Sequence, residues 1–373
     1  MEKILYISLS LEKSNYGGSI VSRSNLKGLK HNTALQIKEI AIVRKIEDIY
    51  SYELLADTSK IKTAFNNFRG YAGRLNSRII SEIRNIIIDY KPTIIYLDSS
   101  LLGCIAKWCK NEVPQAKVVT FFHNAEYDFE MGRLKTGKLH FLPSLYSSVL
   151  AEREAVKYSD IIITLHKNDS ERLFELYQRR ADFCVPVCII DEPYLDIIEH
   201  DKTIELEKPF TIGFIGTAFY ANIQAAEYIS QHIATAFNND TQFIIAGNGF
   251  EDYATKLNRP NLKTYGFVES LYDFYENIDV VISPITIGGG MKVKIAEAFK
   301  YNRKVIASSF SLIGYEDSLN NSDVCSCSNL KDYLHAINHL RKSREVKSTT
   351  RELYKKYYSE KACASYFKDV FKQ

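Results

Sequence analysis

Three consecutive glycines, Gly288 to Gly290, stand between an apolar run and a charged segment that contains Lys292, Lys294 and Glu297. Glycine has no Cβ, so a ligand can approach this backbone closely. A helix that starts here would present unpaired N–H groups and its positive dipole end to an anion. At 100° per residue, Gly290, Lys294 and Glu297 are predicted to lie on one face of that helix. A cation and a carboxylate on one side suit a ligand with both phosphate and hydroxyl groups, such as a nucleoside diphosphate sugar.

The segment from Gly288 to Ala298 reads GGGMKVKIAEA. It resembles the donor-binding signature of retaining GT-B glycosyltransferases of the family-4-like branch, where GGG is followed by a small residue, Arg or Lys, an aliphatic residue, Lys, two aliphatic residues and Glu-Ala. The resemblance implies that Glu297 holds the nucleotide ribose and that the leaving diphosphate is stabilised by a catalytic Lys292 or Lys294. It also implies nucleotide-sugar contacts from Gly289, Gly290 and Met291.

This chain departs from the pattern at Gly289, because many relatives carry there a glutamate that contacts the sugar. The alternative interpretation is a glycine-rich connection in another doubly wound enzyme, with Lys292 and Lys294 as solvated helix charges.

Composition restricts the class of protein. The chain has 373 residues, enough for two domains that each bury a core. Its net charge of +3 is too small to indicate a nucleic-acid partner. The seven cysteines lack a second pair at zinc-site spacing, so we expect free thiols, a cytoplasmic protein and no metal site. No stretch approaches the roughly 20 apolar residues of a membrane span.

Short apolar runs alternate with amphipathic stretches in two series, which predicts an α/β fold with two doubly wound, Rossmann-like domains. The expected strands are residues 3–8, 94–98, 117–122 and 160–165, and then 210–215, 242–246, 262–266, 279–283 and 303–308. The charged, proline-containing segment between the two series predicts a linker. The resemblance implies the GT-B arrangement, in which the two domains face each other across a cleft and a final helix crosses back to the first. The predicted boundaries are 1–190 for the acceptor-side domain, 191–209 for the linker, 210–350 for the nucleotide-sugar domain and 351–373 for the crossing helix.

Two motifs of the first half follow predicted strands. Gly17 and Gly18 precede an expected helix, where the resemblance implies backbone contacts with the donor diphosphate and the acceptor; the alternative is a plain tight turn. His123 ends the strand 117–122, at the strand end where catalytic groups of open α/β sheets lie. It is our first catalytic candidate, against a histidine bonded to neighbouring carbonyls. Glu126 is either a site residue or a charge favoured at a helix start.

Further candidates follow the strands of the second half. Relatives often carry Arg and Lys in the loop after Gly216, whereas this chain has neither, so Gly216 and Thr217 are left as phosphate contacts. Gly247 belongs to a matching Gly-x-Gly. The resemblance places the base near Phe267 and Val268, although this pair is equally consistent with packing at the sheet edge.

Residues 60–84 hold six basic residues and one acid, interleaved with aromatic and aliphatic residues. Such a mixture can rest on an anionic membrane surface, and the alternative is a solvated helix face.

His335 and His339 have helical metal-ligand spacing, but no carboxylate or cysteine completes a site nearby in sequence, and we predict surface histidines and no metal.

We therefore expect a retaining glycosyltransferase without a cofactor. It would move a sugar from a nucleoside diphosphate sugar to a glycan or lipid-linked acceptor in surface polysaccharide biosynthesis, in the cytoplasm or at the inner face of the plasma membrane. The alternatives are a nucleotide-sugar 2-epimerase of the same fold and an inactive, glycosyltransferase-like binding subunit.

Overall fold

The computed structural model describes residues 2–13, 16–32, 34–135, 137, 139–192, 208–238 and 240–372. The chain forms two compact units. Unit 1 comprises Met1–Pro186 and Glu360–Gln373, and unit 2 comprises Val187–Ser359. Most of the predicted linker, residues 193–207, lies outside the described residues.

Unit 1 contains, in its described part, a seven-stranded parallel sheet with the order β3-β2-β1-β4-β5-β6-β7. The strands are β1 (Glu2–Ser8), β2 (Leu35–Val43), β3 (Tyr52–Leu55), β4 (Ile94–Leu97), β5 (Lys117–Phe122), β6 (Ile161–Thr164) and β7 (Phe183–Cys184). The helices are α1 (Gly17–Lys30), α2 (Lys60–Phe68), α3 (Ser77–Tyr90), η1 (Ser100–Leu102), α4 (Gly103–Glu112), α5 (Glu126–Leu134), η2 (Leu139–Phe141), α6 (Leu142–Tyr158), α7 (Lys167–Tyr177) and α15 (Glu360–Val370).

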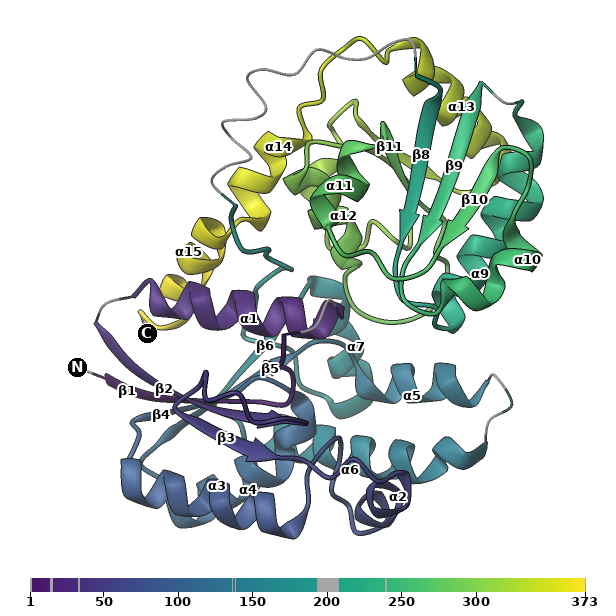
Figure 1. The fold of residues 1–373 in the computed structure, drawn as a ribbon. Coiled ribbons are helices and arrows are strands. Elements are labelled where there is room, and N and C mark those ends of the chain that lie inside the picture. The colour runs from purple at the N-terminus through teal and green to yellow at the C-terminus, as the bar shows by residue number, and fades with distance from the viewer. Residues whose placement is uncertain are drawn as a thin grey trace. The chain divides into compact units, whose positions relative to one another are not determined.

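The central strands of unit 1 are apolar and buried because helices cover both faces of the sheet (Figure 1). On one face α3 buries isoleucines at helical spacing, Ile79, Ile83 and Ile87, in one core with strand residues such as Leu5. Its start is fixed by Asn76, whose side chain accepts a hydrogen bond from the backbone N–H of Ile79.

The last helix, α15, packs against α1 within unit 1, as the yellow and purple helices of Figure 1 show. Glu360 forms ion pairs with Lys27 at 2.7 Å and with His31 at 2.5 Å. A Cβ on Gly28 would lie 2.6 Å from Cys363 Sγ, so the glycine permits this close packing. The first and last helical segments of the chain therefore form one layer of unit 1.

Unit 2 contains, in its described part, a six-stranded parallel sheet with the order β10-β9-β8-β11-β12-β13. The strands are β8 (Phe210–Ile215), β9 (Thr241–Ala246), β10 (Leu262–Tyr265), β11 (Val280–Ser283), β12 (Lys304–Ser308) and β13 (Val324–Cys327). The helical segments are α9 (Tyr220–Tyr228), η3 (Ile229–Ile233), η4 (Ala234–Ala236), η5 (Phe250–Tyr253), α10 (Ala254–Leu257), α11 (Leu271–Glu276), α12 (Val293–Lys300), η6 (Glu316–Ser318), α13 (Leu330–Lys342), α14 (Thr350–Leu353) and η7 (Tyr354–Tyr358).

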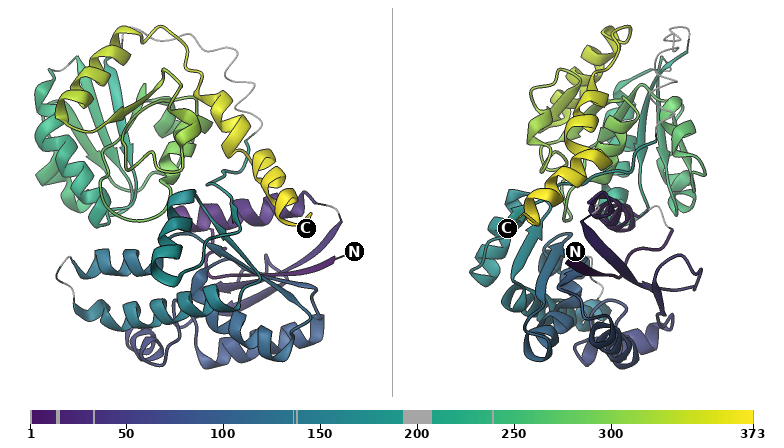
Figure 2. Two further views of the ribbon diagram at one scale, coloured as in Figure 1. Left: turned by 180° about the vertical axis from the view of Figure 1, so that it is seen from behind. Right: turned by 90° about the vertical axis from the view of Figure 1, so that its left-hand side faces the viewer.

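Helices again lie on both faces of the unit 2 sheet (Figure 2). Ala225 of α9 and Ile337 of α13 share a core with β8. Both units are thus doubly wound and Rossmann-like, which confirms the predicted fold class.

The structure adds the strands β2, β3, β7 and β13, which were not predicted. One expectation about local structure is wrong. The helix after the glycines begins at Val293, so Gly290 lies in the preceding loop and does not share a helix face with Lys294 and Glu297.

Candidate functional site

The loops that follow β8, β9, β10 and β11 meet at one edge of the unit 2 sheet, because parallel strands end on the same side. Backbone hydrogen bonds tie these loops together. The N–H of Gly216 donates to the carbonyl of Ala246 at 3.0 Å, and that of Gly247 donates to the carbonyl of Gly266 at 2.9 Å. The edge therefore presents a joined set of glycine-containing loops.

Gly247 lies so close to Gly216 that only glycine fits there. Its φ of +138° is one that other residues rarely adopt, and a Cβ would lie 1.9 Å from the Gly216 carbonyl oxygen. Gly216 is crowded on its other side, where a Cβ would lie 2.7 Å from Asn222 Nδ2 and 3.0 Å from Lys294 Nζ. Gly247 thus allows the loop after β9 to approach the loop after β8, and Gly216 allows that loop to approach Lys294 of α12.

The triple-glycine loop precedes α12 and is held by Lys292. Gly288 and Gly290 have positive φ values of 110° and 59°. The Lys292 ammonium donates to the carbonyls of Gly289 at 3.0 Å and Gly290 at 2.7 Å, while its own carbonyl accepts from the Tyr315 hydroxyl at 2.9 Å. Lys292 thus closes the loop over the helix start.

Lys294 is a buried cation, with 8% of its surface exposed. Its ammonium donates to Asn222 Oδ1 at 3.0 Å and lies 3.8 Å from the centre of the Phe214 ring. Burial lowers the pKa of Lys294 to about 7; the neighbouring Lys292 lowers it further, and Glu297 opposes the shift. A second negative charge near this ammonium would favour its charged form.

Glu297 lies one turn further along α12 and is also 8% exposed. Its Oε2 accepts a hydrogen bond from the Tyr275 hydroxyl at 3.1 Å, and Tyr275 is fully buried. Burial raises the pKa of Glu297, against the opposing effects of this hydrogen bond, Lys300 and Lys294. Lys294 and Glu297 therefore form a partly desolvated cation and carboxylate on one helix.

The remaining predicted contacts of unit 2 are Met291, Phe267, Val268 and Thr217. The Met291 side chain is buried against Gly314, and its sulfur accepts from the backbone N–H of Val187 at 3.4 Å, so it packs the unit. Phe267 is exposed and Val268 partly exposed, both in the loop after β10. The Thr217 carbonyl accepts from Asn222 Nδ2 at 2.8 Å.

In unit 1, His123 follows β5 and Asp98 follows β4. His123 Nε2 lies 2.9 Å from the Asp98 carbonyl oxygen and 3.7 Å from its Oδ1. The carboxylate of Asp98 also accepts from Ser8 Oγ at 2.9 Å, at the end of β1. Three neighbouring strands thus bring a histidine, a carboxylate and a hydroxyl together at the carboxyl edge of this sheet.

Gly17 and Gly18 are the first residues of α1, and a Cβ on Gly18 would meet open space. Glu126 is the first residue of α5 and is buried. Burial raises its pKa to about 8, with further contributions from the nearby Glu152 and Glu130. Its backbone N–H donates to Glu152 Oε1 at 2.8 Å.

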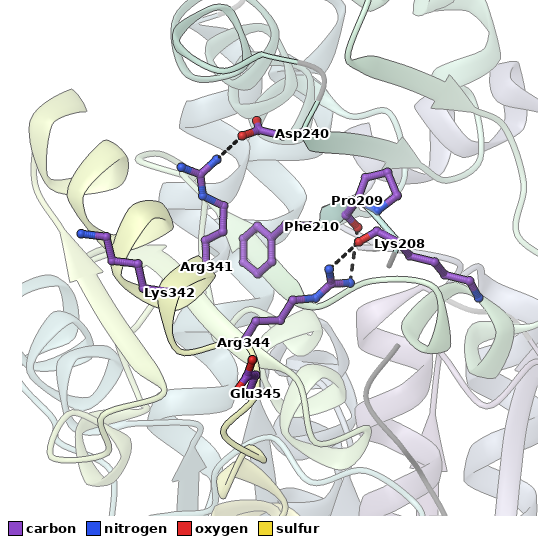
Figure 3. A pocket seen from close by; sticks show the side chains of 8 residues that line it. All are labelled: Lys208, Pro209, Phe210, Asp240, Arg341, Lys342, Arg344 and Glu345. Carbon is purple, nitrogen blue, oxygen red and sulfur yellow. Dashed lines mark hydrogen bonds and ion pairs between the residues drawn. The ribbon is translucent and has the colours of Figure 1, made fainter. Parts of the chain in front are cut away.

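A cavity of about 510 Å³ lies at the opposite edge of the unit 2 sheet, where the strands begin (Figure 3). Its arginines are engaged within the unit. Arg341 pairs with Asp240 at 2.8 Å, and Arg344 pairs with Asp279 at 2.9 Å and donates to the Lys208 and Pro209 carbonyls. These contacts hold the end of α13 and the residues after it against the segments that precede β8, β9 and β11.

The basic segment 60–84 is spread over several environments. Arg74 pairs with Glu12 at 3.0 Å, Arg78 pairs with Glu82 at 3.1 Å, and Arg84 lies over the Trp108 ring. None of the described helices is long and apolar enough to cross a membrane. In the described part of the chain, no group of three or more His, Cys, Asp or Glu side chains is placed to hold a metal ion.

Unit 2 contains a segment that matches a known protein family. The model of the family Glycosyl transferases group 1 matches residues 209–342, which include the glycine loop and α12. None of the curated protein sequences matches this chain.

Solved structures match over both units. HepE of Anabaena in complex with UDP-glucose is 11% identical, with a TM-score of 0.67 and 99% of each chain covered. The chain has the GT-B fold. A glycosyltransferase from Rickettsia africae is 13% identical, with a TM-score of 0.64 and coverage of 100% of this chain and 98% of the other. The lipopolysaccharide outer core galactosyltransferase WaaB is 13% identical, with a TM-score of 0.61 and coverage of 99% and 98%.

Sequence reasoning missed Asn222, Tyr275 and Asp98. Asp98 had a signal, since a carboxylate directly after an apolar strand lies at the functional edge of a parallel sheet. Asn222 and Tyr275 had none, because their partners, Lys294 and Glu297, are 72 and 22 residues away in sequence.

Proposed function

We propose that this protein is a retaining glycosyltransferase that transfers a sugar from a nucleoside diphosphate sugar to a glycan acceptor. The observation that carries the proposal is the α12 site of unit 2. There a glycine loop, a helix start, the Lys294 ammonium and the Glu297 carboxylate lie together within the segment that matches glycosyltransferases. The complexes of HepE with UDP and UDP-glucose support a nucleotide-sugar donor.

The chemistry follows from the charges of this site. As the bond between the sugar C1 and the phosphate oxygen breaks, its electron pair passes to the diphosphate. The helix start and Lys294 stabilise that developing charge, a preorganised electrostatic effect that contributes several kcal/mol. The acceptor hydroxyl oxygen bonds to C1 on the same face, and its proton passes to the leaving phosphate. Glu297 binds the ribose hydroxyls, and His123 remains the first catalytic candidate of unit 1.

Incubation with a panel of UDP- and GDP-sugars tests this proposal. Slow hydrolysis, which yields the free nucleotide and sugar, supports a transferase. Interconversion of two nucleotide sugars would instead indicate an epimerase. Binding without turnover would favour the inactive subunit, the alternative suggested by Gly289 in place of a sugar-contacting glutamate. The melting temperature with each nucleotide sugar of the panel provides a second test. A ligand at 100 times its Kd adds about 2.7 kcal/mol of apparent stability, so a melting temperature that no member of the panel raises would refute the proposal.

We also propose that α2 contacts the inner face of the plasma membrane, a location that suits a lipid-linked acceptor. Ile61, Phe65 and Phe68 recur at helical spacing on α2 and are 83%, 60% and 68% exposed. Lys60, Lys62 and Arg69 flank this apolar row. Exposed apolar residues beside cations suit a bilayer that contains anionic lipid.

Vesicle sedimentation tests this contact. We expect binding to vesicles with anionic lipid, weakened by 0.5 M salt and by the double substitution Phe65→Ser, Phe68→Ser. Ile88→Ser is the matched control, since Ile88 is an exposed apolar residue on α3. Equal binding to neutral and anionic vesicles, or binding to neither, would contradict the proposal.

A further inference from the structure

Asn222 connects two chain segments of unit 2 through one side-chain amide. It lies in the first turn of α9, and its Nδ2 donates to the Thr217 carbonyl at 2.8 Å. Its Oδ1 accepts from the Lys294 ammonium at 3.0 Å. A carbonyl can only accept a hydrogen bond, so Nδ2 must face Thr217 and Oδ1 must face Lys294. The orientation of this amide is therefore fixed by its partners.

The β8–α9 segment, rather than α12 itself, holds the Lys294 ammonium. Phe214 of β8 places its ring 3.8 Å from Nζ, and Asn222 of α9 supplies the oxygen. Gly216 lies against both groups, since a Cβ there would meet Asn222 Nδ2 and Lys294 Nζ. A lysine side chain is long and flexible, so these contacts select one of its many conformations. The cation is thereby held beside the loop after β8.

In this chain that loop carries no Arg or Lys between Gly216 and Asn222. We propose that Asn222 is a positioning residue for the donor diphosphate, because its amide fastens the Lys294 ammonium to the loop that lacks a cation of its own. This inference rests on the proposed function, because it concerns the same diphosphate site. A lysine of α12 thus supplies the charge on the β8 side of the edge.

The protonation of Lys294 gives this role a measurable signature. Two charged groups act on the Lys294 ammonium: Glu297, which lies further along α12, and Lys292, which is the N-cap of that helix. The elements that hold Nζ, β8 and α9, contribute Phe214 and Asn222, and neither of these titrates. An oxygen that accepts from the ammonium favours its charged form. Removal of Oδ1 should therefore shift the titration of Lys294 to lower pH, and a carboxylate in its place should shift it to higher pH.

The test compares wild type, Asn222→Ala and Asn222→Asp by calorimetric titration with UDP-glucose and GDP-glucose from pH 6 to 9. The bridging diphosphate of these probes does not titrate in this range, unlike the terminal phosphate of UDP. For wild type we expect affinity to fall as the pH rises above about 7, where free Lys294 loses its proton. For Asn222→Ala we expect binding about tenfold weaker at pH 8 and a pH midpoint below that of wild type.

For Asn222→Asp we expect the midpoint to move above that of wild type, with weaker binding throughout because the new carboxylate repels the diphosphate. Asn338→Ala is the matched control: Asn338 is exposed on α13, beside Arg341 at the opposite edge, and its loss should leave the profile unchanged. Variants whose midpoints coincide with that of wild type would overturn the inference, even if their melting temperatures fall. Wild type that binds neither probe would overturn the proposed function and this inference with it.

Discussion

Replacement of Glu297 tests two contacts of its carboxylate, the proposed one with the nucleotide ribose and the hydrogen bond from Tyr275. In Glu297→Ala the buried Tyr275 hydroxyl loses its acceptor, and an unpaired buried donor costs about 1–3 kcal/mol. The same substitution would also remove the proposed charge-assisted contact with the ribose, and such a contact contributes about 1.5–3 kcal/mol. We therefore expect both lower stability and a nucleotide Kd weakened roughly 10- to 150-fold.

Glu297→Gln distinguishes the two effects. Its amide oxygen can still accept from Tyr275, and it avoids burial of a charge that the raised pKa of Glu297 shows to be unfavourable. We expect stability at least equal to that of wild type, with a nucleotide Kd between those of wild type and the alanine variant. Tyr275→Phe is the control that leaves the carboxylate in place. Calorimetric titration with UDP and urea unfolding measure the two quantities, and an unchanged Kd in Glu297→Ala would refute the ribose assignment.

Three further predictions concern buried charges and backbone contacts. Because Lys294 titrates near pH 7 when folded but near 10.4 when unfolded, the unfolded chain binds more protons between these values and wild-type stability rises with pH. Lys294→Met should lack that rise in urea unfolding and should lose nucleotide binding; an identical pH dependence would contradict this. The pKa of Glu126 is about 8 in the folded protein and about 4.3 when unfolded, so the folded protein binds more protons between these values and wild-type stability should fall as the pH rises. Glu126→Gln should therefore be more stable than wild type at pH 8 but not at pH 5. Gly247→Ala should destabilise by about 3 kcal/mol or more, given the overlap of its Cβ with Gly216, whereas Gly18→Ala should leave the melting temperature nearly unchanged; equal melting temperatures for these two variants would argue against the close approach.

The sequence predicted the fold where strands are short and mostly apolar. The expected strands 117–122 and 160–165 correspond to β5 and β6, which are buried along almost their whole length. Leu35–Val43 was missed because its first half is only partly buried and carries polar residues. Val324–Cys327 is a four-residue edge strand of valine, cysteine and serine, too short and too polar for that pattern to appear.

The candidate site was predictable in its residue types but not in its environment. The motif indicated Lys294 and Glu297, yet charged residues are rarely buried, and nothing local in the sequence shows that both are. Their burial depends on Phe214, Asn222 and Tyr275, which reach them only after the sheet of unit 2 has formed. Long-range partners of this kind carry no periodic signal.

The packing of α15 on α1 determines the order in which the protein can mature during synthesis. Most of unit 1 precedes unit 2 along the chain, but the helix that packs on α1 is α15, which follows unit 2. Unit 2 is continuous and can complete its core during translation. Because α15 follows unit 2 along the chain, α1 stays uncovered until the ribosome has made unit 2 and then α15.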